Sequence, residues 1–272
     1  MEARNAGRDP ESDLEYLGEL FGLRGRRALV TGARQGIGCA IALALARAGA
    51  SVAVTSRRRE ALDALAVELD ALRVVHAELE LELTSEHAIR AAVEEATTAL
   101  GGLDIVVNNA GLSVRKPALE LTSGEWDAVM ATNLRAPFLL SREAVRAMGD
   151  RGGRIVNVSS TFARSAVADR SAYAASKAGL EQLTRALAVE WAPLGVTVNA
   201  VALTATPTET RSALLPTAEA RARRVRQIPL SRLGEPDDAV GAVLLLLGAA
   251  GGFITGHTIL VDGGYTLGPG AP

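Results

Sequence analysis

The chain has 272 residues, of which 48% are hydrophobic and 22% charged, and its formal net charge at pH 7 is −2. A chain of this length can bury a full core as one α/β domain, and without an excess of basic residues it offers no general attraction to nucleic acid. The apolar runs are too short for a membrane span, and the single cysteine, Cys39, excludes an intramolecular disulfide.

The first 20 residues are polar and acidic and lack the apolar stretch of a signal peptide, so we expect no export. Together with the single cysteine, this favours a cytoplasmic protein. Residues 1–22 are expected to form a loosely held arm, and residues 23–272 a single domain. The three histidines are scattered and give no metal-ligand spacing, so no metal site is predicted.

From Arg27 the pattern becomes strand, turn and helix. Residues 28–30 are an apolar strand, residues 31–38 read Thr-Gly-Ala-Arg-Gln-Gly-Ile-Gly, and residues 39–48 form an apolar helix closed by Gly49. In this order the glycines let the backbone approach a pyrophosphate, and the free N–H groups of the helix start stabilise its charge. A glycine turn alone is weak evidence, and its G-x-x-x-G-x-G spacing differs from the G-x-G-x-x-G of many dinucleotide sites.

The end of the second strand, residues 51–55, bears on which dinucleotide is expected. An acid here would bind the ribose hydroxyls of NAD, but the strand is followed by Ser-Arg-Arg-Arg at 56–59. Arg57, with Arg34 in the glycine turn, can clamp the 2′-phosphate of NADP, so we favour NADP over NAD. The same arginines would also suit a solvated entry to a helix over 60–72.

Strands and helices then alternate to the end of the chain. Further strands are predicted at 74–83, 101–107, 154–158, 196–201 and 258–261, and helices at 86–100, 126–148, 171–192 and from about 238. The helix over 126–148 should kink at Asn133 and Pro137. This pattern predicts an α/β fold: a single-domain, Rossmann-like, doubly wound parallel sheet of about seven strands with helices on both faces.

Tyr173 and Lys177 lie four residues apart, so on a helix their side chains leave one face together. A phenol with a pKa near ~10 has to be lowered by roughly 3 units to work near neutrality, and one charge at ~4 Å supplies about that free energy. The chain has 29 lysines and arginines together, and only two of them, Lys116 and Lys177, are lysines. A lysine at 177 therefore suggests a site that needs a compact ammonium rather than a guanidinium. Alone the pair decides nothing, because Tyr-x-x-x-Lys also occurs on ordinary amphipathic helices.

The glycine turn, the Asn-Asn-Ala-Gly run at 108–111, a strand-end serine and Tyr-x-x-x-Lys follow one another on one predicted sheet. With these motifs the chain resembles the short-chain dehydrogenase/reductase family over about residues 22–266. The resemblance rests on residues 31–38 and 108–111, on Asn133, on Ser160 thirteen residues before Tyr173, on Lys177 and Asn199, and on the Gly256 to Gly264 ending.

The resemblance implies a catalytic set. Tyr173 would donate a proton to a carbonyl as hydride arrives from the nicotinamide, and Ser160 would hydrogen-bond the reacting oxygen. Lys177 would lower the pKa of Tyr173 and hold the nicotinamide ribose, and Asn133 would position a water that links Lys177 to solvent. Taken singly, Ser160, Asn133 and Asn108 would each suit a purely structural role.

The resemblance also implies a cofactor site. It assigns dinucleotide contacts to Gly32, Arg34, Gln35, Gly36, Ile37, Gly38, Arg57, Glu82, Leu83, Asn109, Ala110, Gly111, Tyr173, Lys177, Thr206 and Thr208. Two departures from the family pattern bear on this set. Glu82 stands where an aspartate is usual, and Leu203-Thr204 replaces a Pro-Gly pair that shapes the nicotinamide pocket.

The leading hypothesis is an NADP-dependent carbonyl reductase or alcohol dehydrogenase for a 3-oxoacyl thioester or for a sugar acid or polyol. The competing hypothesis is a catalytically silent regulatory or scaffold protein that binds the cofactor. By resemblance we expect a homo-oligomer, either a tetramer or a dimer. The substrate mouth is expected at Ser113, Arg115, Lys116, residues 161–163 and an excursion at 204–227, where arginines 211, 221, 223, 224 and 226 can attract an anionic substrate or form an ordinary charged helix surface.

Overall fold

The computed structural model describes residues 10–207 and 217–268. Within them the chain forms a seven-stranded parallel sheet in the order β3-β2-β1-β4-β5-β6-β7. The strands are β1 (Arg27–Val30), β2 (Ser51–Ser56), β3 (His76–Glu80), β4 (Ile105–Asn108), β5 (Gly153–Ser160), β6 (Val196–Leu203) and β7 (Thr258–Val261). The predicted doubly wound α/β fold is thus confirmed.

The sheet is buried on both faces, as its apolar strands require. Successive side chains of a strand point to opposite faces. In β1, Ala28 and Val30 pack into a buried cluster on one face, whereas Leu29 packs into a cluster on the other. Ile155 and Val156 of β5 divide between the two clusters in the same way.

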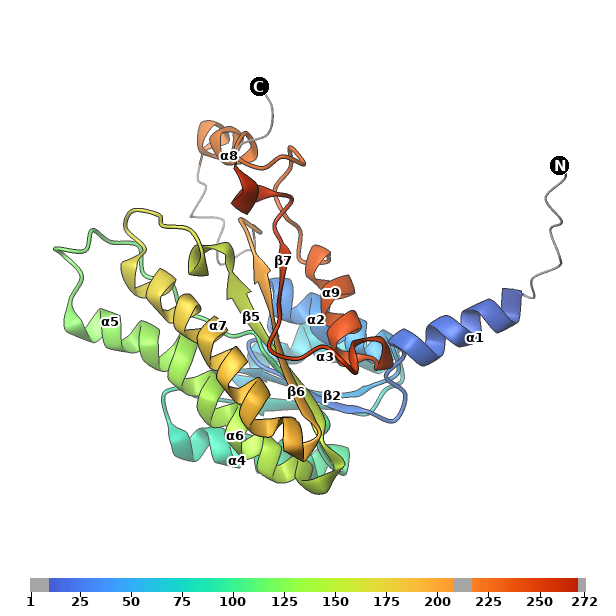
Figure 1. The fold of residues 1–272 in the computed structure, drawn as a ribbon. Coiled ribbons are helices and arrows are strands. Elements are labelled where there is room, and N and C mark those ends of the chain that lie inside the picture. The colour runs from blue at the N-terminus through green and yellow to red at the C-terminus, as the bar shows by residue number, and fades with distance from the viewer. Residues whose placement is uncertain (1–9, 208–216, 269–272) are drawn as a thin grey trace, which may run out of the picture.

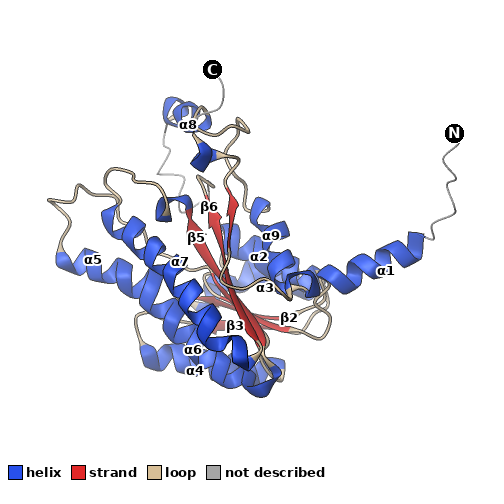
Figure 2. Ribbon diagram, viewed as in Figure 1, coloured by secondary structure: helices blue, strands red, loops and turns tan. Residues whose placement is uncertain are grey.

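Helices cover both faces, which gives three layers (Figures 1 and 2). One buried cluster joins the sheet to α2 (Gly36–Arg47), α3 (Asp63–Ala71) and α9 (Asp238–Leu247). The other joins it to α4 (Glu86–Leu100), α6 (Ala136–Met148) and α7 (Ser171–Trp191). The short helix α8 (Ala218–Val225) lies beyond the carboxyl ends of the strands (Figure 1).

The helix expected over 126–148 is interrupted differently from the prediction. It consists of α5 (Ser123–Met130), a π-helical turn at Ala131–Arg135, and α6. Pro137 is the second residue of α6, directly after this π turn. The wider π turn, rather than a proline kink, interrupts the helix, and it leaves Asn133 fully buried.

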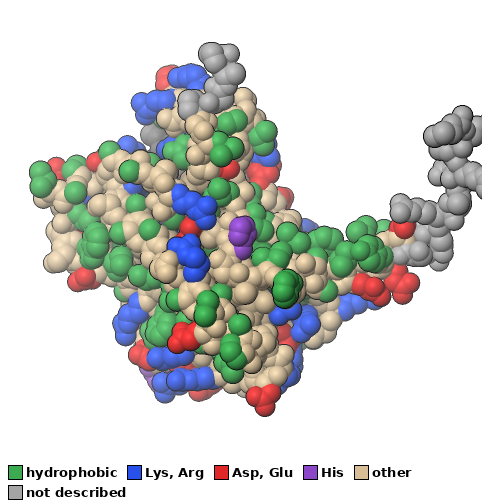
Figure 3. All heavy atoms as spheres, viewed as in Figure 1, with side chains coloured by type: hydrophobic (Ala, Val, Ile, Leu, Met, Phe, Trp, Pro, Cys, Tyr) green, Lys and Arg blue, Asp and Glu red, His purple; other side chains and the backbone are tan. Residues whose placement is uncertain are grey.

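The segment expected as a loosely held arm contains the helix α1 (Pro10–Phe21). The helix projects from the body, and Figure 3 shows hydrophobic side chains along it. Its carboxyl end is docked: Leu23 N donates to Ala48 O at 2.7 Å, and a Cβ on Gly248 would stand 2.5 Å from Leu20 O. Leu14 and Tyr16 remain more than half exposed.

The strand order has a functional consequence. From β1 the chain winds outward through β2 and β3 and then returns to β4, on the other side of β1. At such a switch point the loops after the two central strands diverge, and ligands of α/β sheets bind in the crevice between them. The glycine turn after β1 and residues 109–111 after β4 both lie at this crevice.

Candidate active site

The turn after β1 needs its glycines. Gly32 has φ +65°, and a Cβ there would stand 3.0 Å from Ala110 Cα. A Cβ on Gly38 would collide with Asn109 Nδ2 and stand 2.5 Å from Gly32 O. The glycines thus let the turn after β1 pack closely against the loop after β4 at the start of α2, where a pyrophosphate would bind.

Thr31 locks this cradle to the loop after β4. Its buried Oγ1 accepts hydrogen bonds from Asn109 N at 3.0 Å and Ala110 N at 3.1 Å. Asn109 Nδ2 in turn donates to the carbonyl oxygens of Thr31 and Gly32 at 2.9 and 3.0 Å. This role of Thr31 was not predicted from the glycine motif, although its place at the end of the first strand is a signal for such a link.

The cradle also fits a dinucleotide chemically. Gln35 Nε2 is a buried donor without a hydrogen-bond partner among the described residues. Arg34 and Arg57 are exposed, and Ala33 N donates to Thr55 O at 3.0 Å, so the turn lies against the end of β2. Donors and positive charge therefore line the path that a dinucleotide phosphate would take.

Glu82 is held by its own loop. Its Oε1 accepts from Thr84 N at 2.9 Å and Thr84 Oγ1 at 2.8 Å. These bonds hold the pKa of Glu82 below its usual value, and the charge of Arg57 adds to the effect. Glu82 and Leu83 follow the end of β3, next to β2, so Glu82 lies within electrostatic reach of Arg57.

Three predicted catalytic residues come together beside the cradle. Tyr173 and Lys177 are one turn apart on α7, Ser160 ends β5, and all three are less than a tenth exposed. Lys177 Nζ donates to Val158 O at 2.7 Å and lies 5.9 Å from the centroid of the Tyr173 ring. Ser160 and Tyr173 line one cavity of about 620 Å³.

Phe162 fixes two members of this set. Its backbone N donates to Ser160 Oγ at 3.2 Å, and its ring packs edge-on against Tyr173 with centroids 6.2 Å apart. Since Ser160 Oγ accepts that bond, its own hydroxyl proton can be donated elsewhere.

Asn133 lies behind the set, on the π turn. Its side chain accepts from Leu112 N at 2.7 Å and donates to Leu112 O at 2.8 Å and Ser176 Oγ at 3.0 Å. A Cβ on Gly111 would stand 3.4 Å from Asn133 Oδ1 and 3.8 Å from Lys177 Nζ. Asn133 therefore ties the loop after β4 to α7, and its link to solvent stays a prediction.

A buried chain of amides holds α7 against the sheet. Asn108 Nδ2 donates to Asn157 Oδ1 at 2.7 Å, and Asn157 Nδ2 donates to Thr184 Oγ1 at 2.9 Å. These bonds run from β4 through β5 to α7, so they help to set where Tyr173 stands.

The turn that replaces the usual Pro-Gly pair leads into the same cavity. Thr204, Ala205 and Thr206 line it, and Gly234 N donates to Ala205 O at 3.0 Å. Thr206 is 5% exposed and donates to Thr204 O at 3.3 Å. Thr208 and Arg211 lie outside the described residues.

The substrate mouth differs in part from the prediction. Ser113, Arg115, Thr161, Phe162, Arg223 and Arg224 line the cavity, but Lys116 does not, because its Nζ binds both Glu125 oxygens at 3.0 and 3.1 Å. Ala163, Arg221 and Arg226 are also absent from the lining. Two lining residues were not predicted: Arg170, whose position three residues before Tyr173 is the one signal for it in the sequence, and Tyr265 near the chain end.

Comparison with known proteins agrees with this geometry. A family model described as enoyl-(acyl carrier protein) reductase matches residues 32–266. Gluconate 5-dehydrogenase of Gluconobacter oxydans is 34% identical over 250 residues, which are 92% of this chain and 98% of that protein. A 3-oxoacyl-(acyl-carrier-protein) reductase of Aquifex aeolicus is 39% identical over 244 residues, or 89% and 98% of the two chains.

A solved crystal structure with a similar level of sequence identity has the same fold. The crystal structure of a gluconate 5-dehydrogenase from Burkholderia cenocepacia, in complex with NADP and tartrate, matches with a TM-score of 0.88 at 33% identity, covering 92% of this chain and 99% of that one. The chain belongs to the short-chain dehydrogenase/reductase family. As a member of this family it is an oxidoreductase. The helix α1 lies before the residues that the family model matches.

Two further properties concern only the residues that the structure describes. Among 10–207 and 217–268, no helix is long and apolar enough to cross a membrane. Within the same two ranges, no group of three or more His, Cys, Asp or Glu side chains is placed so that it could bind a metal ion. The cytoplasmic location stays a prediction from the sequence.

Proposed function

We propose that this protein interconverts a carbonyl and a secondary alcohol by hydride transfer, with NADPH-dependent ketone reduction as its main direction. The observation that carries the proposal is the shared cavity of Ser160 and Tyr173, with Lys177 against the Tyr173 ring and the glycine cradle beside it. A panel of ketones and alcohols, assayed with NADPH and NADH side by side, tests it directly.

In this proposal each residue has a distinct task. The nicotinamide, when bound, supplies the hydride. Tyr173 gives its phenolic proton to the carbonyl oxygen, and Ser160 donates a hydrogen bond to the same oxygen. The ammonium of Lys177 stabilises the phenolate that Tyr173 becomes. Asn133 holds the loop that contains Gly111 next to Lys177 on α7.

The cofactor contacts follow the same logic. We place the pyrophosphate on residues 32 and 34–38, the adenosine end beside Arg57, Glu82 and Leu83, and the nicotinamide ribose on residues 109–111 with Tyr173, Lys177 and Thr206. The glycine turn at the start of α2 and the buried donor of Gln35 support the first assignment. The NADP in the Burkholderia cenocepacia complex supports the choice of dinucleotide.

Reversing the charge of Arg57 is expected to reverse the cofactor preference. The Arg57→Asp variant should lose about tenfold to a hundredfold in kcat/KM with NADPH, because charge-assisted hydrogen bonds to the 2′-phosphate are lost, and it should gain with NADH. The control is Arg151→Asp, the same change at an exposed residue before β5, at the amino ends of the parallel strands, whereas Arg57 follows the carboxyl end of β2. A wild-type preference for NADH would refute the role of Arg57.

The substrate proposal covers two classes. The relatives act, by name, on gluconate and on 3-oxoacyl chains carried by a protein. A cavity of about 620 Å³ lined by Thr204, Phe162 and several arginines suits a small oxygenated ketone of either class. The ketone panel should therefore contain a keto sugar acid, a keto polyol and a 3-oxoacyl thioester.

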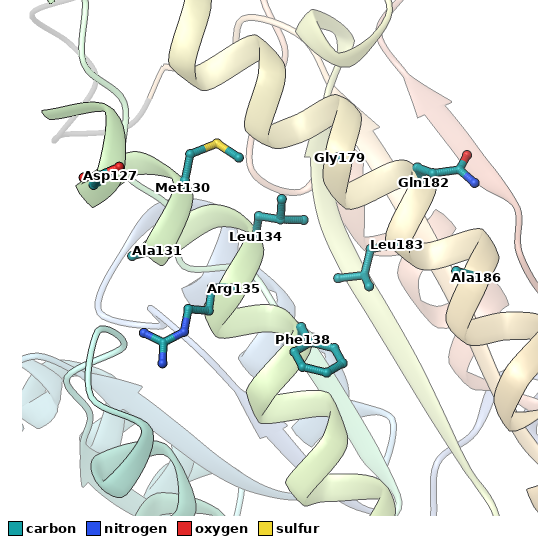
Figure 4. A pocket seen from close by; sticks show the side chains of 10 residues that line it. All are labelled: Asp127, Met130, Ala131, Leu134, Arg135, Phe138, Gly179, Gln182, Leu183 and Ala186. Carbon is teal, nitrogen blue, oxygen red and sulfur yellow. The ribbon is translucent and has the colours of Figure 1, made fainter. Parts of the chain in front are cut away.

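We also propose that copies of the chain associate as a dimer or a tetramer. A hollow of about 650 Å³ lies between α5, α6 and α7, where Met130, Leu134, Phe138, Leu183 and Ala186 present apolar side chains (Figure 4). Apolar surface of this kind is typical of subunit contacts. Light scattering on the purified protein measures the state, and a monomer at micromolar concentration would contradict the proposal.

A further inference from the structure

The substrate cavity carries an excess of positive charge. Among the residues that the structure describes, four arginines and one acid line it, namely Arg115, Arg170, Arg223, Arg224 and Asp169. The chain as a whole has a net charge of −2, so this excess belongs to the cavity and not to the protein at large. The carboxylate of Asp169 is paired with one of these arginines, because its Oδ2 lies 3.9 Å from Arg115 Nε.

Arg170 differs from the other arginines in being buried. It is 7% exposed, whereas Arg115 and Arg223 are exposed. Its Nη1 donates to Ser113 Oγ at 2.6 Å, and both residues line the cavity. Arg170 is also three residues before Tyr173, one helical turn away, so the guanidinium and the proposed proton donor share a wall of the cavity.

The backbone holds Arg170 in this place. Asp169 has φ +64°, a left-handed conformation that side-chain-bearing residues seldom adopt. Lys116 N donates to Asp169 O at 3.0 Å, and Ala174 N donates to Arg170 O at 2.8 Å. The strained turn is therefore fixed on one side by the loop after β4 and on the other by the first turn of α7.

Arg224 closes the other side of the cavity. Its guanidinium lies 5.9 Å from the Phe162 ring centroid and 5.3 Å from that of Tyr265, and it donates to the Tyr265 hydroxyl at 2.9 Å. Two aromatic rings and a hydroxyl thus hold this charge at the mouth. Arg224 can draw an anion inward, while Arg170 lies deeper, beside Ser113 and Tyr173.

We infer that the substrate carries a carboxylate, and that Arg170 together with Ser113 binds it while the carbonyl reacts at Tyr173. A guanidinium presents its donors in a planar fork, which matches the geometry of a carboxylate. Because Arg170 is buried, a bidentate pair here is screened less by solvent than one at the surface. The inference rests on the proposed function for the reacting carbonyl, and among the substrate classes it selects small oxo acids over neutral thioesters.

The test compares oxo acids with their neutral esters. The probes are laevulinate and acetoacetate, each beside its methyl ester, titrated calorimetrically into protein saturated with NADP⁺, which cannot reduce a ketone. We expect the wild type to bind one acid at least about tenfold more tightly than its ester. Arg170→Gln should remove this preference and leave ester binding unchanged, and Arg170→Lys should keep part of it.

The control is Arg185→Gln, which removes the same charge from an exposed position on α7, outside the cavity. Equal weakening of acid and ester by Arg170→Gln, or no weakening of either, would overturn the inference. If Arg170→Gln fails to fold, Arg170→Lys and Ser113→Ala test the inference instead, because both variants should weaken binding of the acid more than binding of the ester. If acids bind through Arg170 but no ketone is reduced with NADPH, the carboxylate site stands and the proposed function fails.

Discussion

Tyr173→Phe is expected to lower kcat by about a hundredfold to ten-thousandfold while NADPH still binds within a few-fold of the wild type. Only the hydroxyl is removed, so the edge-on contact with Phe162 and the approach of Lys177 to the ring persist. Steady-state kinetics with the best ketone of the panel, and a fluorescence titration with NADPH, measure the two quantities separately.

Tyr16→Phe provides the matched control, because it is the same chemical change at a 61% exposed residue on α1. It should leave both quantities unchanged. Full turnover by Tyr173→Phe would mean that the proton comes from another group. A wild type that binds NADPH but reduces no ketone in the panel would support the regulatory or scaffold hypothesis instead.

Asp104→Asn is expected to lower the free energy of unfolding by about 3 kcal/mol, the lower part of the range for breaking a buried ion pair, because Arg27 is 22% exposed. Asp104 is buried and accepts from Arg27 Nε and Nη2, both at 2.7 Å, and from Arg27 N at 3.0 Å. This cluster joins the start of β1 to the segment that enters β4. Urea denaturation at neutral pH measures the loss.

The same pair predicts a pH dependence. Burial alone would raise the pKa of Asp104, but the hydrogen bonds and charge of Arg27 outweigh it and hold the pKa below its usual value. A carboxyl group whose pKa is lowered by folding stabilises the protein above its unfolded pKa, near ~4, and this contribution is lost as the pH falls through the lower, folded pKa. The difference between wild type and Asp104→Asn should therefore shrink in acid.

Asp150→Asn, at an exposed residue, is the control and should change the unfolding free energy little at any pH. A loss below about 1 kcal/mol for Asp104→Asn, or a loss that stays constant down to acid pH, would show that the pair contributes no more than an ordinary surface bridge.

Local patterns predicted much of the fold. The helix expected at 86–100 is α4 with those bounds, and Ser85 caps it by accepting from Ala88 N at 3.2 Å. The strand expected at 258–261 is β7. Periodicity and capping act over a few residues, so they can be recognised from the sequence alone.

Other features depend on contacts between distant segments. Lys116 was expected at the substrate mouth, but it binds Glu125, which also forms a capping box with Thr122 at the start of α5. The Thr-x-x-Glu spacing could have revealed the box, although not its lysine. The π turn around Asn133 and the closing of the cavity by Tyr265 had no local signal, because each follows from packing against another part of the chain.

The most direct test of hydride and proton transfer at this site is an isotope experiment. NADPH in which both hydrogens at the nicotinamide C4 position are replaced by deuterium is mixed with a ketone from the panel, and the product alcohol is analysed by mass spectrometry. We predict one deuterium on the carbinol carbon with the wild type and almost none with Tyr173→Phe over the same time. Deuterium that stays on the cofactor with every ketone, in protein shown to bind NADPH, would contradict this account.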